Sequence, residues 1–140
     1  GTFNVYNVNK GQLVKQIGEN SVYAISPDDQ YMAVRSNIEQ QLKIIDRHTG
    51  REVKVLETSK GYYRLLVYSP DGQYIAVHSD DGLLLWNVSA GKIVRRLRGH
   101  PDIVGNWIGF DAEGRYFAAV CNKYVVVWDF RKLIGAGQPN

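Results

Sequence analysis

The chain has 140 residues, of which 44% are hydrophobic and 22% are charged, and its formal net charge is +3 at pH 7. This composition excludes a disordered tail and a coiled coil, and the small positive charge argues against nucleic acid as a partner. No apolar run approaches the roughly 20 residues of a membrane-spanning helix. The single cysteine, Cys121, excludes an internal disulfide and a cysteine-based zinc site.

Short apolar segments separated by turn residues predict β-strands along the whole chain. Two strands are expected over residues 3–17, four over 22–56, four over 65–97, and three or four over 107–134. Side chains alternate within several of these segments, so that in 92–97 Arg95 and Arg96 point to opposite faces. Since no segment shows a convincing helical period, the predicted fold is all-β.

The first of two repeated motifs is a turn sequence with a period of about 42 residues. Ser-Pro-Asp-Asp-Gln-Tyr at 26–31 recurs as Ser-Pro-Asp-Gly-Gln-Tyr at 69–74, and a weaker copy occupies 111–116. Proline fixes φ at the first corner, and Asp followed by Gly closes the turn. Because apolar strands flank each copy, each one predicts a β-hairpin.

The second motif ends an apolar stretch with Asn or Asp and places Gly four residues later. It occurs over residues 5–11, 44–50 and 85–91, and in part over 127–132. Asn or Asp followed by Gly marks a further turn, and another short strand follows in the first three copies. The two motifs alternate, which gives four strands in each period.

Four short strands in each period, the third ending in Trp-Asn or Trp-Asp, resemble the WD40 repeat of β-propellers. The matching residues are Trp86-Asn87, Trp128-Asp129, Gly99-His100, Ser69-Pro70-Asp71-Gly72 and the turn Ser79-Asp80-Asp81-Gly82. The resemblance covers nearly the whole chain. It implies blades of four antiparallel strands, named a to d from the inside outward, with strand a lining a central channel.

The resemblance also implies structural roles for Trp86, Trp128 and His100. In the family, the His, a Ser or Thr of strand b, an Asp of the b–c turn and the Trp form a buried hydrogen-bond network. In the last blade of this chain, Cys121 stands at the Ser position and Asn122 or Lys123 at the Asp position. The network is therefore expected to be incomplete there.

The strands amount to about 3.5 blades, whereas propellers close with about 4–8. The blade segments are 1–20, 21–60, 61–100 and 101–134, and 135–140 is expected to be a flexible tail or linker. We expect the chain, which begins with Gly1 instead of Met, to be a segment of a larger propeller. The alternatives are a seven-bladed ring made of two copies, and a small strained ring closed by a single chain.

Catalytic residues, cofactors and metal ions are not predicted. The sequence contains no nucleophile motif or phosphate-binding loop, and His48, His78 and His100 belong to different blade positions. A propeller enzyme of the lactonase or quinoprotein type is the alternative, and it would need acidic or His residues at the channel. The strand-a segments 22–25, 65–68 and 107–110 are mostly apolar, which argues against such an enzyme.

The expected function is a scaffold that binds a peptide or a protein domain, in the cytoplasm or alternatively the nucleus. In the family, partners usually dock at the rim that contains the start of strand a and the b–c turns. Exposed aromatic, cationic and polar side chains at this rim are therefore candidate contacts. These are Arg35, Asn37, Tyr62, Tyr63, Arg64, His78, Asp80, Asn106 and Lys123. Packing between blades is the alternative for Tyr63 and the favoured interpretation for Trp107.

Overall fold

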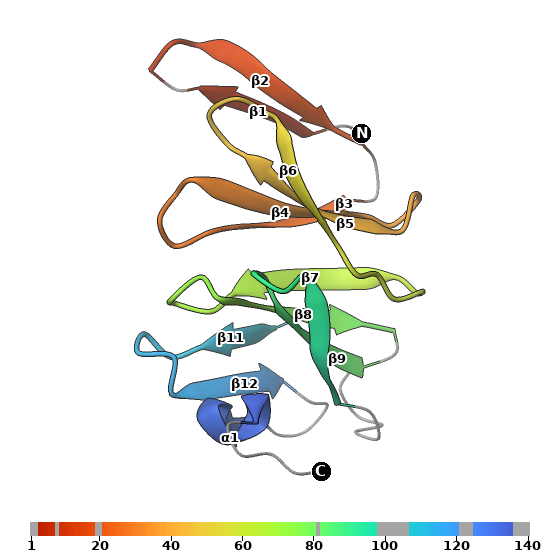
Figure 1. Cartoon of the computed structure of the whole chain (residues 1–140), viewed down its shortest axis with the longest axis vertical. Helices are drawn as coiled ribbons and strands as arrows, with labels where there is room; N and C mark the ends of the chain where they lie inside the picture. The colour runs from red at the N-terminus through yellow and green to blue at the C-terminus, as the bar shows by residue number, and fades with distance from the viewer. Residues whose placement is uncertain are drawn as a thin grey trace.

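The computed structural model describes residues 3–7, 9–18, 21–80, 82–97, 107–120 and 125–135. Its strands form antiparallel sheets that follow one another along the chain and stack from the N-terminus to the C-terminus (Figure 1). Within the described residues these sheets have two, four, four and three strands. The prediction of a β-fold built from four-stranded antiparallel blades is confirmed.

The first sheet pairs β1 (Phe3–Asn7) with β2 (Gln12–Ile17). The second sheet is a meander in which each strand pairs with the next. Its strands are β3 (Ser21–Ile25), β4 (Tyr31–Ser36), β5 (Gln41–Asp46) and β6 (Glu52–Leu56).

The third sheet repeats the order of the second. Its strands are β7 (Tyr63–Tyr68), β8 (Tyr74–Ser79), β9 (Gly82–Asn87) and β10 (Lys92–Leu97). The first strands of the two sheets, β3 and β7, contact each other, whereas β6 and β10 lie at the far edges of their sheets. This arrangement makes β3 and β7 inner strands and β6 and β10 outer strands.

The hairpins predicted from Ser-Pro-Asp are confirmed at both four-stranded sheets. The Ser69 hydroxyl donates to Asp71 Oδ1 at 2.6 Å and accepts from the backbone N–H of Tyr74 at 3.0 Å, and Ser26 makes the same bonds to Asp28 and Tyr31. Each serine therefore locks the turn and the start of the next strand at once.

The last sheet contains β11 (Ile108–Phe110), β12 (Tyr116–Val120) and β13 (Val125–Asp129), and the helix α1 (Phe130–Ile134) follows directly. The expectation that no segment is helical, and that a fourth strand could end this sheet, is wrong. The Asp129 side chain accepts from the backbone N–H of Lys132 and caps the helix, and Gly135 ends it at a φ of 84°. Of the expected tail, only Gly135 belongs to the described residues.

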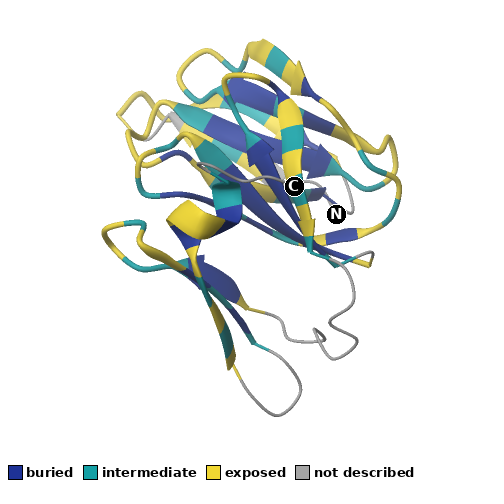
Figure 2. Cartoon of the chain, turned by 60° about the horizontal axis from the view of Figure 1, so that its bottom comes forward, coloured by how far each residue is buried: buried dark blue, intermediate teal, exposed yellow. Residues whose placement is uncertain are grey.

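Both faces of the third sheet are buried, which explains why β8 and β9 are almost continuously apolar (Figure 2). Val77 and Trp86 face the second sheet, and this packing is called the central seam. Ala76 and Leu85 face the last sheet and α1, and this packing is called the last seam. A smaller core around Ile17, which includes residues of β4 and β5, joins the first sheet to the second.

Candidate functional site

The rim at the start of the inner strands contains the exposed candidate residues. Arg64 Nη2 donates to Asp80 Oδ1 at 2.8 Å, and its guanidinium carbon lies 5.8 Å from the centre of the Tyr62 ring. The backbone N–H of Asp80 also donates to the Tyr62 carbonyl at 3.1 Å, which holds the end of β8 against the start of β7. Tyr62, Arg64 and Asp80 are all exposed, and we call them the rim triad.

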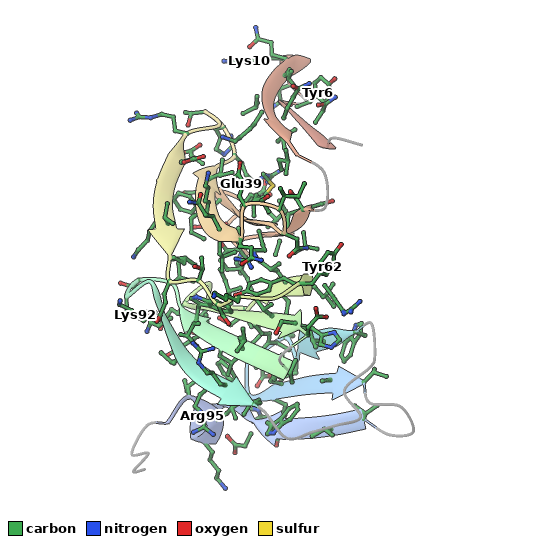
Figure 3. The ribbon with its side chains drawn as sticks, turned by 90° about the vertical axis from the view of Figure 1, so that its right-hand side faces the viewer. Tyr6, Lys10, Glu39, Tyr62, Lys92 and Arg95 are labelled. Atoms are coloured by element: carbon green, nitrogen blue, oxygen red, sulfur yellow. The ribbon has the colours of Figure 1, made fainter. Side chains whose placement is uncertain are left out.

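The rim triad combines an aromatic face, a cation and a carboxylate on one rigid edge. The Tyr62 side chain is 43% exposed, and it lies on the side of the inner strands, away from Lys92 on β10 (Figure 3). Arg64 uses one guanidinium nitrogen for Asp80, so its other N–H groups face solvent. Such a group can contact both an apolar side chain and a carboxylate of a partner.

Arg35 and His78 are buried, so the expectation that they are exposed on the rim is wrong. Both occupy the fifth position of a strand, in β4 and β8, where neighbouring sheets cover both faces. Their spacing of 43 residues, equal to that of Tyr31 and Tyr74, is the signal that could have revealed their equivalent positions.

Arg35 holds the segment that connects the second sheet to the third. Its Nη2 donates to the carbonyls of Ser59 at 3.1 Å and Gly61 at 3.0 Å, and its guanidinium lies 3.9 Å above the Tyr63 ring. Burial lowers the pKa of the Arg35 guanidinium. Arg35 therefore acts within the chain, as a cation packed on an aromatic ring.

Tyr63 packs between the blades, in agreement with the alternative interpretation, and is fully buried. Its ring centre lies 5.8 Å from that of Trp86, and its hydroxyl donates to the Ser59 carbonyl at 3.3 Å. The half-buried Asn37 side chain both donates to and accepts from the backbone of Tyr63, each at 2.8 Å. Both residues thus contribute to the central seam.

Trp107 is 51% exposed, so no sheet among the described residues packs on it, and the favoured interpretation that it packs between blades stays a prediction. Its ring lies over Gly109 of β11, the strand that follows it, where a Cβ atom would come within 2.7 Å of Trp107 Cζ2. The absence of a side chain at Gly109 is what gives the indole this position.

Of the residues expected to have structural roles, Trp86 and Trp128 lie in the described part of the chain. Trp86 is fully buried and its Nε1 donates to the Glu57 carbonyl at 2.7 Å, while Trp128 stacks on Phe117 with ring centres 5.7 Å apart. His100, Asn106 and Lys123, together with Cys121 and Asn122, lie outside the described residues.

A lysine that bonds to the next sheet occurs at equivalent positions of two sheets, and the sequence did not predict it. Lys15 Nζ donates to the Gly50 carbonyl at 3.3 Å, and Lys54 Nζ donates to the carbonyls of Val88, at 2.9 Å, and Ser89. In both cases an outer strand of one sheet is tied to the turn that follows the third strand of the next. Each lysine stands four residues after the glycine of the second motif, and Arg95 on β10 has the same position.

Among the residues that the structure describes, no three His, Cys, Asp or Glu side chains are grouped to hold a metal ion. No helix among them has the length and apolarity needed to cross a membrane.

Comparison with known proteins gives one family. The model of the WD domain, G-beta repeat, matches residues 91–129. An uncharacterized WD repeat-containing protein of Synechocystis is 27% identical over 75% of this chain, and a UBP9-binding protein of Schizosaccharomyces pombe is 27% identical over 77% of it. The chain spans only 30% and 21% of the lengths of these two relatives.

A solved structure supports the same fold. The hydrazine synthase of Kuenenia stuttgartiensis superposes on 94% of this chain with a TM-score of 0.74 and 13% sequence identity. The matching region makes up 40% of that chain. At this level of identity, the likeness extends to the fold alone.

Proposed function

We infer that the chain belongs to the WD40-repeat β-propellers, and on that premise we propose that it is a protein-interaction scaffold and not an enzyme. The observation that carries the proposal is the rim triad: Tyr62, Arg64 and Asp80 are exposed together and held by mutual contacts. Aromatic and arginine side chains dominate the binding energy of protein interfaces, and rigid positions reduce the entropy lost on binding.

Two exposed apolar residues lie at the same ends of the strands in the neighbouring sheets. Ile38, in the turn between β4 and β5, is 67% exposed, and Trp107 is half exposed before β11. Both are on the same rim as the triad, because this rim contains the b–c turns and the starts of the inner strands. We propose that a partner's peptide or domain contacts this rim. A relative whose name describes it as UBP9-binding supports a binding role.

We propose the cytoplasm as the compartment, with the nucleus as the alternative. The lone Cys121 supports this choice because it fits a reducing environment.

The interaction is tested by site-specific photo-crosslinking in cells that produce the protein containing this chain. A photoreactive phenylalanine analogue replaces Tyr62, and in a matched control it replaces the exposed Lys92 on the outer strand β10. We expect a discrete crosslinked protein from position 62 and its loss when Arg64→Glu is added. Equal crosslinking from both positions would contradict the proposal.

We also propose that further blades cover the outer faces of the first and last sheets. On β13, Val125 and Val127 are 57% and 59% exposed, and on the first sheet Tyr6 and Leu13 are about half exposed. These apolar faces are equivalent to faces that are buried in the third sheet. Relatives several times longer than this chain are consistent with additional blades.

The second candidate is a ring of two copies, in which these same faces pair across a two-fold axis. Light scattering of the 140-residue chain separates the two proposals. A monomeric mass supports further blades from a longer chain. A mass of two chains that Val127→Asp returns to one, with the circular dichroism spectrum unchanged, supports the two-copy ring.

A further inference from the structure

A groove of about 600 Å³ opens at the outer end of the central seam, on the rim opposite the rim triad. The two Ser-Pro-Asp turns form its mouth, and a Cβ atom on Gly72 of the second turn would lie 3.6 Å from Pro27 of the first. Tyr31, Ile44 and Tyr68 line its apolar part.

The last seam shows how a groove of this kind is filled. There the equivalents of Tyr31 and Tyr68 are Tyr74 and Phe110, and the Phe130 ring of α1 lies between them. Its centre is 5.4 Å from that of Tyr74 and 4.8 Å from that of Phe110, with both contacts edge-to-face. In the central seam, Val88 takes the place of Phe130, and the smaller side chain leaves the groove open.

The groove contains a polar group that the described residues do not satisfy. Tyr68 is only 7% exposed, and its hydroxyl has no hydrogen-bond partner among the described residues. A buried hydroxyl without a partner is costly and uncommon. Burial and the nearby negative charge of Asp28 raise the pKa of Tyr68 well above its ordinary range, so the hydroxyl is neutral.

The charges that line the groove favour a cation. Asp28 and Asp71 each use one carboxylate oxygen, Oδ1, for their own turn, which leaves the other oxygen of each carboxylate for a ligand. Hydrogen bonds from Ser26 and from the Gln30 backbone lower the pKa of Asp28, which is therefore ionised at neutral pH. Lys54 is the only cation in the lining, and the Val88 and Ser89 carbonyls hold its ammonium group.

We propose that this groove binds a short segment of a partner protein that carries an aromatic side chain next to an arginine. The aromatic ring would take the place that Phe130 has in the last seam, between Tyr31 and Tyr68. The guanidinium would pair with Asp28 and donate to the Tyr68 hydroxyl oxygen. The site lies on the rim opposite the rim triad, so it does not depend on the function proposed for that triad.

The chain itself supplies a probe for this groove. The peptide acetyl-Phe-Arg-Lys-Leu-Ile-amide copies the sequence of α1, and it can be titrated into the ¹⁵N-labelled chain and followed by NMR. We expect saturable shifts of the amides of 28–31, 71–74 and 88–89, with a dissociation constant on the order of 0.1–1 mM. Replacing the peptide's Phe by Ala, or its Arg and Lys by Gln, is expected to abolish these shifts.

Two variants test the assigned contacts. Tyr68→Phe is expected to weaken peptide binding about fivefold to tenfold, and Asp28→Asn about fivefold, because each removes one hydrogen bond or charge. Asp29→Asn is the matched control: it removes the same charge one residue away, outside the groove lining, and binding should change less than about twofold.

The stability of Tyr68→Phe gives an independent readout. Without peptide, the variant should melt at the same temperature as the wild type or higher, because it removes an unsatisfied hydroxyl. A lower melting temperature would show that the hydroxyl has a structural partner and would overturn the inference. So would shifts confined to α1 and its neighbours, since the peptide would then only displace α1. Tyr62→Ala should leave peptide binding intact, which separates this site from the rim triad.

Discussion

The central seam and the last seam bury similar apolar side chains, yet they differ at one end: the central seam has an open groove there, and the last seam is filled. Across the central seam, the backbone N–H of Glu57 donates to the Gly91 carbonyl at 2.8 Å and the Glu57 carboxylate accepts from the Ile93 N–H at 2.8 Å. The indole of Trp86 and the ammonium of Lys54 add further bonds. In the described part of the last seam, aromatic rings fill the interface, with Phe130 of α1 at its end.

The difference that the described residues show lies at one end of each seam. Hydrogen bonds fix the central seam in register, because each requires a particular donor and acceptor. The central seam keeps an open groove beside Val88, whereas Phe130 fills the equivalent place in the last seam. One large aromatic side chain is thus enough to close the end of a seam.

The largest expected effect comes from removing the main side chain of the central seam. Trp86→Ala leaves a cavity between two sheets and removes the bond to Glu57, and it should lower the free energy of unfolding by about 4 kcal/mol. Urea denaturation measures this change. Trp107→Ala is the control at a half-exposed tryptophan and should cost less than about 1 kcal/mol. Equal losses would contradict the assignment of Trp86 to the core.

Removing the ring that fills the last seam should have a slightly smaller and more local effect. Phe130→Ala is expected to cost about 3 kcal/mol, because Phe130 is buried against Phe110 and Tyr74. Hydrogen exchange should accelerate in β11–β13 before it does so in β7–β10. Uniform acceleration in both sheets would show that the two seams open together.

The contribution of the contact between the first and second sheets to stability can be measured by comparing alanine substitutions at two glycines of equal φ. Gly50 and Gly72 both have φ of 74°, but a Cβ on Gly50 would lie 2.7 Å from the Val14 carbonyl oxygen, whereas one on Gly72 has room. Gly72→Ala should cost about 1 kcal/mol for the backbone conformation alone. Gly50→Ala should cost about 2 kcal/mol, because the sheets must also move apart. Equal values from thermal unfolding would contradict the close approach.

The smallest expected effect is on the pH dependence of stability, which should differ between the turns capped by Asp46 and by Asn87. Backbone N–H groups of His48 and Thr49 lower the pKa of Asp46 below its ordinary value of 3.8. The associated stability is complete above that value and is lost as the pH falls through the lower pKa of the folded state. Asn87 caps the equivalent turn without a charge. Asp46→Asn should thus flatten the fall in stability at acid pH.

An unchanged acid slope in Asp46→Asn would contradict this assignment. Asn87→Asp provides the reciprocal control, because it places a titratable carboxyl at the equivalent cap and should steepen the slope.

Much of the fold follows from local sequence, because the turns are made by the residues next to them. Ser-Pro-Asp predicts the hairpins, and the Asn or Asp of the second motif predicts the turns that Asp46 and Asn87 cap. The same local chemistry was present at α1, where Asp129 caps the helix and Gly135 ends it. The helix was missed because five residues are too few to show a helical period.

The parts that the sequence did not predict depend on what covers each sheet. Arg35 and His78 resemble turn residues in the sequence, yet both are buried because sheets lie on either side of β4 and β8. Trp107 is exposed because its ring lies over Gly109, on the face of the last sheet that no described sheet covers. The groove depends on a difference in side-chain size between Val88 and Phe130. These two residues are recognised as equivalent only when the two seams are compared in the structure.

The lysine that bonds to the next sheet has a consequence for how such a chain can grow. Lys54 lies on one sheet and reaches the turn of the next, so one contact between these sheets consists of a single side chain and a pair of carbonyls. A duplicated unit of about 40 residues carries both the cation and the turn that receives it. Every new copy thus carries one contact to the next sheet within its own sequence.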